Sequence, residues 1–247
     1  MLSRKLIKYI QSLSHKKFRD AHEVFLAEGP KIILEFLTSN RFKCELICAL
    51  PQWIDQLGSD VTTGVDVHSV DEIMLGRLST LSTPNQVLGV FQKRAGDTSP
   101  DLNNKLTLML DDIKDPGNFG SIIRTADWFG VKNLICSFGS VDCYNPKVVQ
   151  GSMGSLSRVS ILYTDLKEFL AKYPKIKVYA ATLSGSSIYK ISNFEEGIVI
   201  IGNESAGVSQ DLLNIATHQV AIPRFGNAES LNASVAVGII LSHLTAK

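Results

Sequence analysis

Short, nearly continuous apolar runs recur along the second half of the chain, and a stretch with helical periodicity follows each of them. Such runs are typical of strands buried on both faces of a parallel sheet. We expect strands at Leu106–Leu110, Val131–Cys136, Val178–Thr182, Ile198–Gly202 and Gln219–Ile222. We expect helices at Ser121–Phe129, Lys147–Leu156, Leu166–Lys172 and Val208–Ala216. Strand–helix alternation over about 140 residues predicts an α/β fold with a doubly wound parallel sheet.

The first part of the chain has the same alternation on a smaller scale. A helical pattern covers residues 1–13, and the residues that follow predict strands and helices in turn at Val24–Glu28, Lys31–Leu37, Leu46–Leu50, Gln52–Leu57, Val65–His68, Val70–Leu78 and Gln86–Phe91. Residues 96–105 are rich in Asp, Asn, Ser, Gly and Pro, a composition that marks a linker. We therefore predict a small α/β domain at 1–95, a linker at 96–105 and a larger domain at 106–247.

An exposed polar loop near the carboxyl end leads directly into an apolar helix. Pro223 and Gly226 interrupt the loop, and Ser230 has a hydroxyl suited to capping a helix N-terminus. The helix is expected to begin near Ser230. Its apolar run is much shorter than the roughly 20 residues that span a bilayer, so it predicts a buried helix.

Composition narrows the class of protein. The chain has 247 residues, of which 45% are hydrophobic and 20% charged, as in ordinary globular proteins. The first residues lack the apolar region of a signal peptide, so we expect a cytoplasmic protein without a membrane segment. The four cysteines lack zinc-site spacing and are expected to be reduced thiols, and each of the five histidines is expected to be structural: Cys44, Cys48, Cys136, Cys143, His15, His22, His68, His218 and His243.

The net charge of +1 gives no general argument for nucleic acid, but basic residues are concentrated at the amino end. Residues 1–19 contain no acidic residue and six basic ones: Arg4, Lys5, Lys8, Lys16, Lys17 and Arg19. Such a cluster is suited to phosphates, although a solvated helix face has the same composition.

Three polar turns follow predicted strands, and the first is Asp115–Asp127. It lacks the glycine pattern of a dinucleotide site and the Gly-Lys-Ser/Thr of a phosphate loop. G-x-x-G, a spacing that clamps RNA backbone in one module, occurs at Gly117–Gly120 and Gly151–Gly154, but it is also common at helix starts. Arg124 lies about one turn into the predicted helix, where it either reaches a ligand or pairs with a neighbouring aspartate.

The second turn contains Gly202, Glu204 and Gly207, and the third contains Ser230 and Asn232. Glycines let a ligand approach the backbone, and Glu204 is suited to capping a helix or holding a cation. Together the turns supply amides, hydroxyls, the carboxylate of Glu204 and the guanidinium of Arg124. They contain neither a Ser–His–Asp set nor a metal cluster, which indicates chemistry with little proton shuttling.

The three turns carry motifs in a fixed order. They read N-x-G-x-x-x-R-T-A at 118–126, I-G-N-E-x-x-G-V at 201–208 and I-P-x-x-G-x-x-x-S-L-N-x-S-V-A at 222–236. In this order the chain resembles the SpoU (TrmH-like) family of RNA ribose 2′-O-methyltransferases, of the knotted SPOUT class, over residues 105–245. The resemblance implies a deep trefoil knot near the carboxyl end, S-adenosylmethionine as cofactor, a homodimer and no metal. Residues 1–95 are similar to the RNA-binding extension of many members.

Carried over by position, the resemblance assigns cofactor contacts to five residues: Leu183, Gly202, Ile222, Pro223 and Leu231. It assigns catalytic positions to another five: Asn118, Arg124, Glu204, Ser230 and Asn232. Arg224, Trp128 and Ala233 depart from the family pattern, and the first two leave the substrate contacts open.

The resemblance predicts methylation of a ribose 2′-hydroxyl in structured RNA, with ribosomal RNA favoured over transfer RNA. An in-line methyl transfer depends mainly on positioning. In this scheme Arg124 holds a flanking phosphate and stabilises the developing alkoxide, while Ser230 and Asn232 orient the ribose. Two alternatives are a catalytically silent RNA-binding protein of the same fold and an enzyme that methylates a base.

Overall fold

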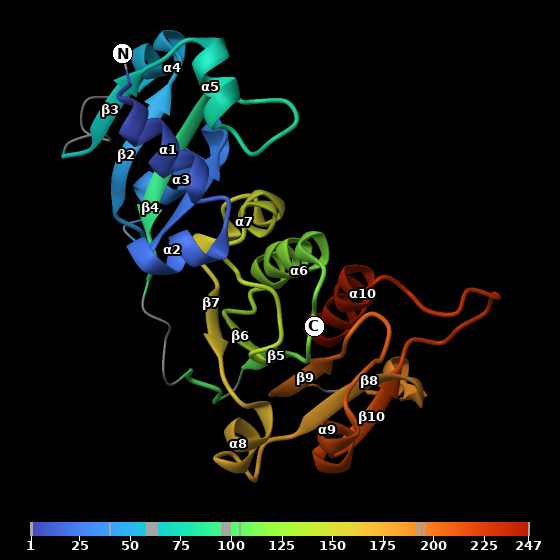
Figure 1. Ribbon diagram of the computed structural model, residues 1–247. Coiled ribbons are helices and arrows are strands. Elements are labelled where there is room, and N and C mark those ends of the chain that lie inside the picture. Colours follow the sequence, from blue (N-terminus) through green and yellow to red (C-terminus); the bar gives the residue numbers. More distant parts are fainter. Residues whose placement is uncertain are drawn as a thin grey trace. The chain divides into compact units, whose positions relative to one another are not determined.

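The chain forms two compact units. A computed structural model describes residues 2–39, 41–57, 64–94, 100–103, 105–191, 194 and 196–246, and its elements are labelled in Figure 1. Unit 1 comprises Met1–Ala95 with Asp142–Ser157, and unit 2 comprises Gly96–Val141 with Arg158–Lys247. Half of the expected linker, at 96–99 and 104, lies outside the described residues.

Unit 1 is a four-stranded sheet with helices, in the strand order β1-β4-β2-β3. Strands β2 and β3 are parallel, whereas β4 pairs antiparallel with both β1 and β2. The predicted strands of this part are confirmed to within two residues. In chain order the elements are α1 (Arg4–Ser12), α2 (Lys16–His22), β1 (Val24–Glu28), α3 (Pro30–Thr38), β2 (Cys44–Ala49), α4 (Pro51–Gln56), β3 (Asp66–Ser69), α5 (Glu72–Leu78), β4 (Val87–Gln92), α7 (Pro146–Ser152) and the 3-10 turn η2 (Ser155–Ser157).

A segment from later in the chain completes the core of unit 1. Residues 142–157 belong to this unit although the chain enters unit 2 before and after them. The ring of Tyr144 packs 4.7 Å from that of Phe25, within a cluster of aromatic side chains. Burial raises the pKa of the Tyr144 hydroxyl, because the charged form loses its hydration. Gly154, in the turn before η2, has φ +93°, and a Cβ there would lie 3.0 Å from the Cβ of Glu35. Glycine at this position therefore allows the turn to pack closely against Glu35.

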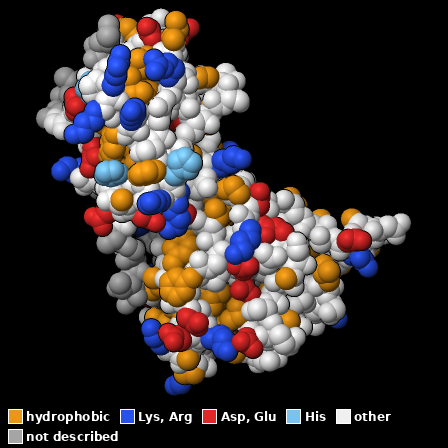
Figure 2. Space-filling model, in the orientation of Figure 1, with side chains coloured by type: hydrophobic (Ala, Val, Ile, Leu, Met, Phe, Trp, Pro, Cys, Tyr) orange, Lys and Arg blue, Asp and Glu red, His pale blue; other side chains and the backbone are white. Residues whose placement is uncertain are grey.

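Arg19 is buried in unit 1, so its assignment to an exposed basic cluster at residues 1–19 was wrong. Its side chain is 2% exposed and donates to Asp142 Oδ2 at 2.7 Å and to two backbone carbonyls. A buried guanidinium needs such partners because an unpaired buried charge is costly. The remaining five basic side chains, Arg4, Lys5, Lys8, Lys16 and Lys17, are exposed on α1 and α2. Figure 2 shows Lys and Arg side chains gathered over this part of unit 1.

Unit 2 is built on a six-stranded sheet with the order β10-β8-β9-β5-β6-β7, and every neighbouring pair is parallel. The predicted doubly wound α/β architecture is confirmed. Its elements are β5 (Leu106–Leu110), α6 (Pro116–Trp128), β6 (Asn133–Cys136), β7 (Ser160–Tyr163), α8 (Leu166–Ala171), β8 (Val178–Ser187), the 3-10 turn η3 (Ile188–Lys190), β9 (Gly197–Ile201), α9 (Gln210–Ile215), β10 (His218–Ala221) and α10 (Ala233–Thr245).

Helices cover both faces of this sheet. Leucine and phenylalanine side chains of α8 and α9 share a buried cluster with Met109, Ile135 and Ile200 of the strands, while α6 and α10 pack together on the opposite face (Figure 1). The strand order changes direction between β5 and β9. Strands β6 and β7 lie on one side of this point beyond β5, and β8 and β10 lie on the other side beyond β9. Ligands of doubly wound sheets bind outside the carboxyl ends of strands at such a switch point.

The cysteines and histidines lie in ordinary structural positions. The four cysteines are buried thiols, and burial raises the pKa of Cys44 to about 12 and that of Cys48 to about 11. The histidines contact local neighbours; for example, His218 stacks on Tyr179 and His22 packs edge-on against Tyr9. Among the described residues, no helix is long and apolar enough to cross a membrane.

Candidate active site

The three polar turns of the sequence lie at the carboxyl ends of strands β5, β9 and β10. The first two flank the switch point directly, because β5 and β9 are neighbours and Asp111 N donates to Ile201 O at 2.9 Å. All ten predicted site residues belong to unit 2. The fold therefore places the chemistry-bearing turns at the edge of the sheet where a ligand is expected.

The first turn is shorter than predicted because helix α6 begins early. Asp115 is its N-cap, with Oδ1 accepting from Asn118 N at 2.7 Å, and Pro116 takes the first helical position. The expected start near Ser121 was therefore wrong by five residues. Asn118 stands in the first turn of the helix with its side chain partly exposed at the sheet edge.

The Asn118 amide joins the three turns. Its Nδ2 donates to Glu204 Oε1 at 3.0 Å, and its Oδ1 accepts from Asn232 Nδ2 at 2.8 Å. An amide can do both because it carries a donor and an acceptor. Residues separated by 86 and 114 positions in the sequence thus form one hydrogen-bonded network. Lys114 N also points to Glu204 Oε2, at 3.5 Å.

The second turn is held in a tight conformation. Asn203 and Gly207 form a two-way backbone bridge with N···O distances of 3.0 and 2.9 Å, and Asn203 Nδ2 donates to Asp112 O at 2.8 Å. A Cβ at Gly202 would lie 2.1 Å from Gly207 C, so only glycine allows this closure. Glu204 does not cap a helix, since α9 begins later with Ser209 at its N-cap.

The third turn ends in a capped helix, but the cap is not the predicted one. Asn232 is the N-cap of α10, and its Oδ1 accepts from Ser234 N at 2.9 Å and Val235 N at 3.4 Å. The expected start at Ser230 was wrong because an asparagine two residues later satisfies the same backbone donors. Ser230 is exposed and has no hydrogen bond within the described chain. Figure 1 shows the loop before α10 projecting from the sheet.

Arg124 is exposed on α6 and, within the described residues, forms no hydrogen bond or ion pair. The aspartates that were alternative partners are engaged elsewhere: Asp127 pairs with Arg158 at 2.9 Å, and Asp115 caps α6. The reading of Arg124 as a paired surface residue is therefore wrong. Trp128, one turn further along the helix, is also exposed (84%).

The residues assigned to the cofactor come from four places in unit 2: Leu183 lies within β8, Gly202 follows β9, Ile222 and Pro223 follow β10, and Leu231 precedes the N-cap of α10. Leu183 is 78% exposed and Leu231 48% exposed, while Ile222 and Pro223 are partly exposed. Between residues 222 and 231 the described structure gives one hydrogen bond, from Arg224 Nη1 to Ala228 O at 3.4 Å. Backbone groups that have no partner among the described residues, beside exposed apolar side chains, fit an adenine, which needs a donor and an acceptor in an apolar slot.

Three residues that hold these turns in place were not among the site residues predicted from the sequence. Asp115 caps α6, Asn203 fixes the second turn, and Lys114 bridges Asp112 at 2.7 Å and Gly139 O at 2.7 Å. The Asp-Pro pair at 115–116 is a helix-start signal that could have identified the first of them. Among described residues no group of three His, Cys, Asp or Glu side chains is arranged to hold a metal ion.

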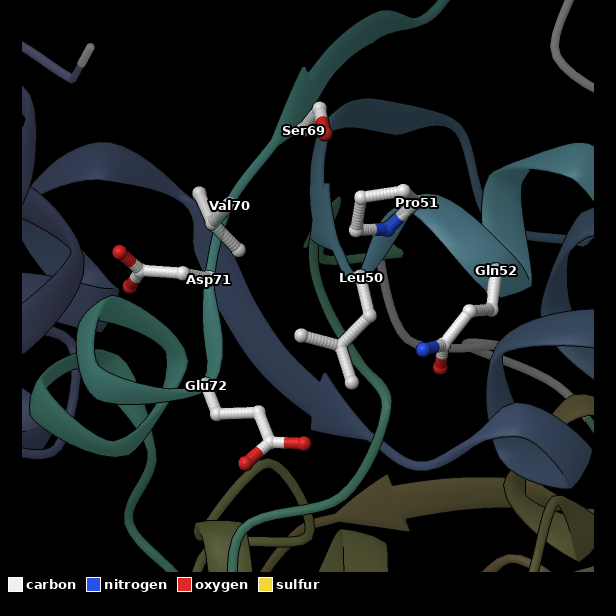
Figure 3. Close-up of a pocket in the computed structure, with 7 residues that line it drawn as sticks. All are labelled: Leu50, Pro51, Gln52, Ser69, Val70, Asp71 and Glu72. Atoms are coloured by element: carbon white, nitrogen blue, oxygen red, sulfur yellow. The ribbon is translucent and has the colours of Figure 1, made fainter.

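A separate hollow of about 370 Å³ lies in unit 1, at the ends of β2 and β3 (Figure 3). Leu50 and Val70 form its apolar part, and Gln52, Asp71 and Glu72 surround it. The Asp71 carboxylate is already used, because it caps α5 by accepting from Met74 N at 2.7 Å. None of the predicted site residues lines this hollow.

Comparison with known proteins identifies both parts of the chain. The SpoU rRNA Methylase family matches residues 105–242, and the MRM3-like substrate binding domain matches residues 4–89. The 23S rRNA (guanosine(2553)-2′-O)-methyltransferase RlmP of Bacillus subtilis is 30% identical over 96% of this chain and 95% of its own length.

Solved structures agree over nearly the whole length. A putative RNA methyltransferase of the TrmH family from Porphyromonas gingivalis is 35% identical, with a TM-score of 0.87, covering 99% of this chain and 98% of its own. An AdoMet-bound rRNA methyltransferase from Sinorhizobium meliloti is 30% identical, with a TM-score of 0.87, covering 99% and 95%. The chain belongs to the SpoU family of RNA methyltransferases.

Proposed function

We propose that the protein transfers a methyl group from S-adenosylmethionine to a ribose 2′-hydroxyl of ribosomal RNA. The observation that carries the proposal is the Asn118–Glu204–Asn232 network, which unites three distant motifs at the switch point of the sheet. Family membership supports the reaction type, and two relatives that cover nearly the whole chain, from Bacillus subtilis and Sinorhizobium meliloti, are named for ribosomal RNA.

The cofactor supplies an electrophilic methyl group on a sulfonium centre, so the chain itself needs to bind and orient. Backbone groups of Gly202, Ile222 and Leu231 hold the adenine, and Leu183 and Pro223 line its apolar slot. Their exposure supports this assignment, as does the 222–231 backbone, where Ala228 O alone has a hydrogen-bond partner among the described residues. No metal is needed, because positioning and charge stabilisation carry most of such a displacement.

Arg124 grips the phosphate next to the target ribose and stabilises the developing 2′-alkoxide. A guanidinium with no protein partner can form two parallel hydrogen bonds to phosphate. It is a poor base because it stays protonated, so its role is electrostatic. Asn232 and Ser230 orient the ribose, and Asn118 and Glu204 hold the Asn232 amide in place, with the Asn118–Asn232 distance of 2.8 Å as support.

The test uses purified protein, S-adenosylmethionine with a labelled methyl group and deproteinised large-subunit ribosomal RNA. A 2′-O-methyl group blocks alkaline cleavage at its own site, so the label should appear in alkali-resistant dinucleotides. Label in mononucleotides would indicate a methylated base. Calorimetry with S-adenosylmethionine alone tests the alternative of a catalytically silent RNA-binding protein, because binding of the cofactor speaks against it and absence of binding supports it. Transfer RNA as the methyl acceptor tests the alternative substrate.

The proposal includes a homodimer through unit 2. Helix α10 carries apolar side chains on all sides, and Val235 is 49% exposed, a surface that a second copy would cover. Light scattering should give twice the chain mass. A trefoil knot near the carboxyl end and a cytoplasmic location complete the proposal, and both rest on family membership.

Residues 1–95 form the substrate-binding domain in this proposal, with Arg4, Lys5 and Lys8 of α1 contacting RNA phosphates. These side chains are exposed, while Ile7 and Ile10 on the other face are buried. Replacing the three basic residues by glutamine should lower the slope of log affinity against log salt by about two units. An unchanged slope would exclude this contact.

A further inference from the structure

The turn at 137–140, directly after strand β6, holds an aromatic side chain in solvent beside the candidate active site. Phe138 is 74% exposed. Burying a phenylalanine is worth about 2–3 kcal/mol relative to exposure, so single exposed rings are unremarkable unless the backbone fixes them in place. The backbone around Phe138 is fixed.

Several hydrogen bonds hold the turn. Ser140 N donates to Ser137 O at 3.0 Å, Ser137 Oγ accepts from Asp112 N at 2.9 Å, and Ser140 Oγ donates to Leu110 O at 3.3 Å. A Cβ at Gly139 would lie 2.1 Å from Asp112 Oδ1, so the turn lies tightly against the loop after β5. A rigid turn presents its ring at little further cost in conformational entropy.

The same contacts connect Phe138 with the candidate active site. Lys114 Nζ donates to Gly139 O at 2.7 Å, and Lys114 N points to Glu204 Oε2 at 3.5 Å. Glu204 in turn accepts from the Asn118 amide. Phe138 is therefore the sequence neighbour of Gly139, and hydrogen bonds through Lys114 and Glu204 connect Gly139 with the proposed ribose site.

The local charge indicates which part of an RNA fits over the ring. Four acidic residues, Asp111, Asp112, Asp115 and Glu204, lie on the loops after β5 and β9, and Lys114 is already paired with Asp112. This edge repels phosphate, whereas a nucleobase is neutral and stacks on aromatic rings. Arg124, which has no partner among the described residues, offers the site for phosphate instead.

We propose that Phe138 is a stacking platform for an unpaired nucleobase of the RNA next to the ribose that receives the methyl group. The inference rests on the proposed function and deepens it, because it predicts a substrate with a locally single-stranded target. Phe138 would act by positioning RNA and not in the chemical step.

The test compares binding of a labelled single-stranded RNA dodecamer and the blunt duplex formed with its complement. Phe138→Ala should weaken binding of the single strand by about 5- to 150-fold, since stacking of one base has that value. It should change binding of the duplex less than two-fold. Phe138→Leu keeps an apolar side chain without a ring and should behave like the alanine variant, whereas Phe138→Trp should bind like the wild type.

Methyl transfer to ribosomal RNA gives a second measurement. For Phe138→Ala we expect a raised KM and a kcat within a few-fold of wild type, with unchanged mass in light scattering and unchanged S-adenosylmethionine binding. Equal binding by the leucine variant and the wild type, equal losses with single strand and duplex, or dissociation of a dimer would each overturn the proposal. Failure of the wild type to bind S-adenosylmethionine would instead contradict the proposed function and leave the RNA comparison interpretable.

Discussion

Replacing Arg124 by alanine should abolish most of the methyl transfer while leaving the fold intact. The side chain is exposed and has no partner in the described part of the chain, so its loss should change the free energy of unfolding by less than about 0.5 kcal/mol. Removing one donor to a developing oxyanion typically costs about 10²–10³ in rate, or roughly 2.7–4 kcal/mol. We expect Arg124→Ala to slow transfer by that factor.

The assay is a single-turnover reaction, with protein in excess over ribosomal RNA and saturating labelled S-adenosylmethionine. Arg124→Lys keeps the charge but loses the two-pronged geometry, so its rate should be intermediate. Lys132→Ala removes another exposed cation of unit 2 and serves as the matched control, with a rate within two-fold of wild type. A rate for Arg124→Ala within a few-fold of wild type, or an equal loss in the control, would refute the assigned role.

Further predictions concern the turns and the buried thiols. Gly202→Ala should weaken S-adenosylmethionine binding at least about tenfold in calorimetry, because the added Cβ would collide with the Gly207 backbone. Gly76→Ala, on α5 of unit 1, would add a Cβ in ordinary van der Waals contact and should leave the binding unchanged. Asn232→Ala should lower the free energy of unfolding by about 1 kcal/mol in urea titrations through loss of the α10 cap, and Asn232→Ser should restore most of it; equal stability of both variants and wild type would exclude the cap. The raised pKa values of Cys44 and Cys48 favour the neutral thiols in the folded state. The contribution of these thiols to the free energy of unfolding is therefore fully present below about pH 8.5, and it is lost as the pH rises toward 11 and beyond. Replacing both cysteines by alanine should flatten this pH dependence of the free energy of unfolding.

Much of the fold follows from the hydrophobic pattern, because strands buried on both faces leave uninterrupted apolar runs. β5 was predicted with its observed bounds, and β9 and β10 were each displaced by one residue. β7 was missed because its four residues are only partly buried and carry a weak signal. β8 continues to Ser187 because Ser186 and Ser187 pair with β10, a tertiary contact without a local signature.

The candidate site could be located from its motifs, but its internal contacts could not. Polar turns after strands predicted the sheet edge, since parallel strands end together. The contact between Asn118 and Asn232 depends on strand order, which the local sequence does not encode. The burial of Arg19 against Asp142 likewise requires a segment of chain 123 residues away. Helix starts were misplaced where a nearby Asp or Asn offered a better cap than the residue chosen.

Whether Asn118 and Glu204 act together, as members of one site with Asn232, can be measured by a double-mutant cycle on the single-turnover rate. Asn118→Ala and Glu204→Ala each remove one side of the 3.0 Å hydrogen bond. If the two residues work through that contact, the double variant should be about as slow as the slower single variant. Rate losses that multiply in the double variant would show that the two residues act independently and that the three turns do not form one site.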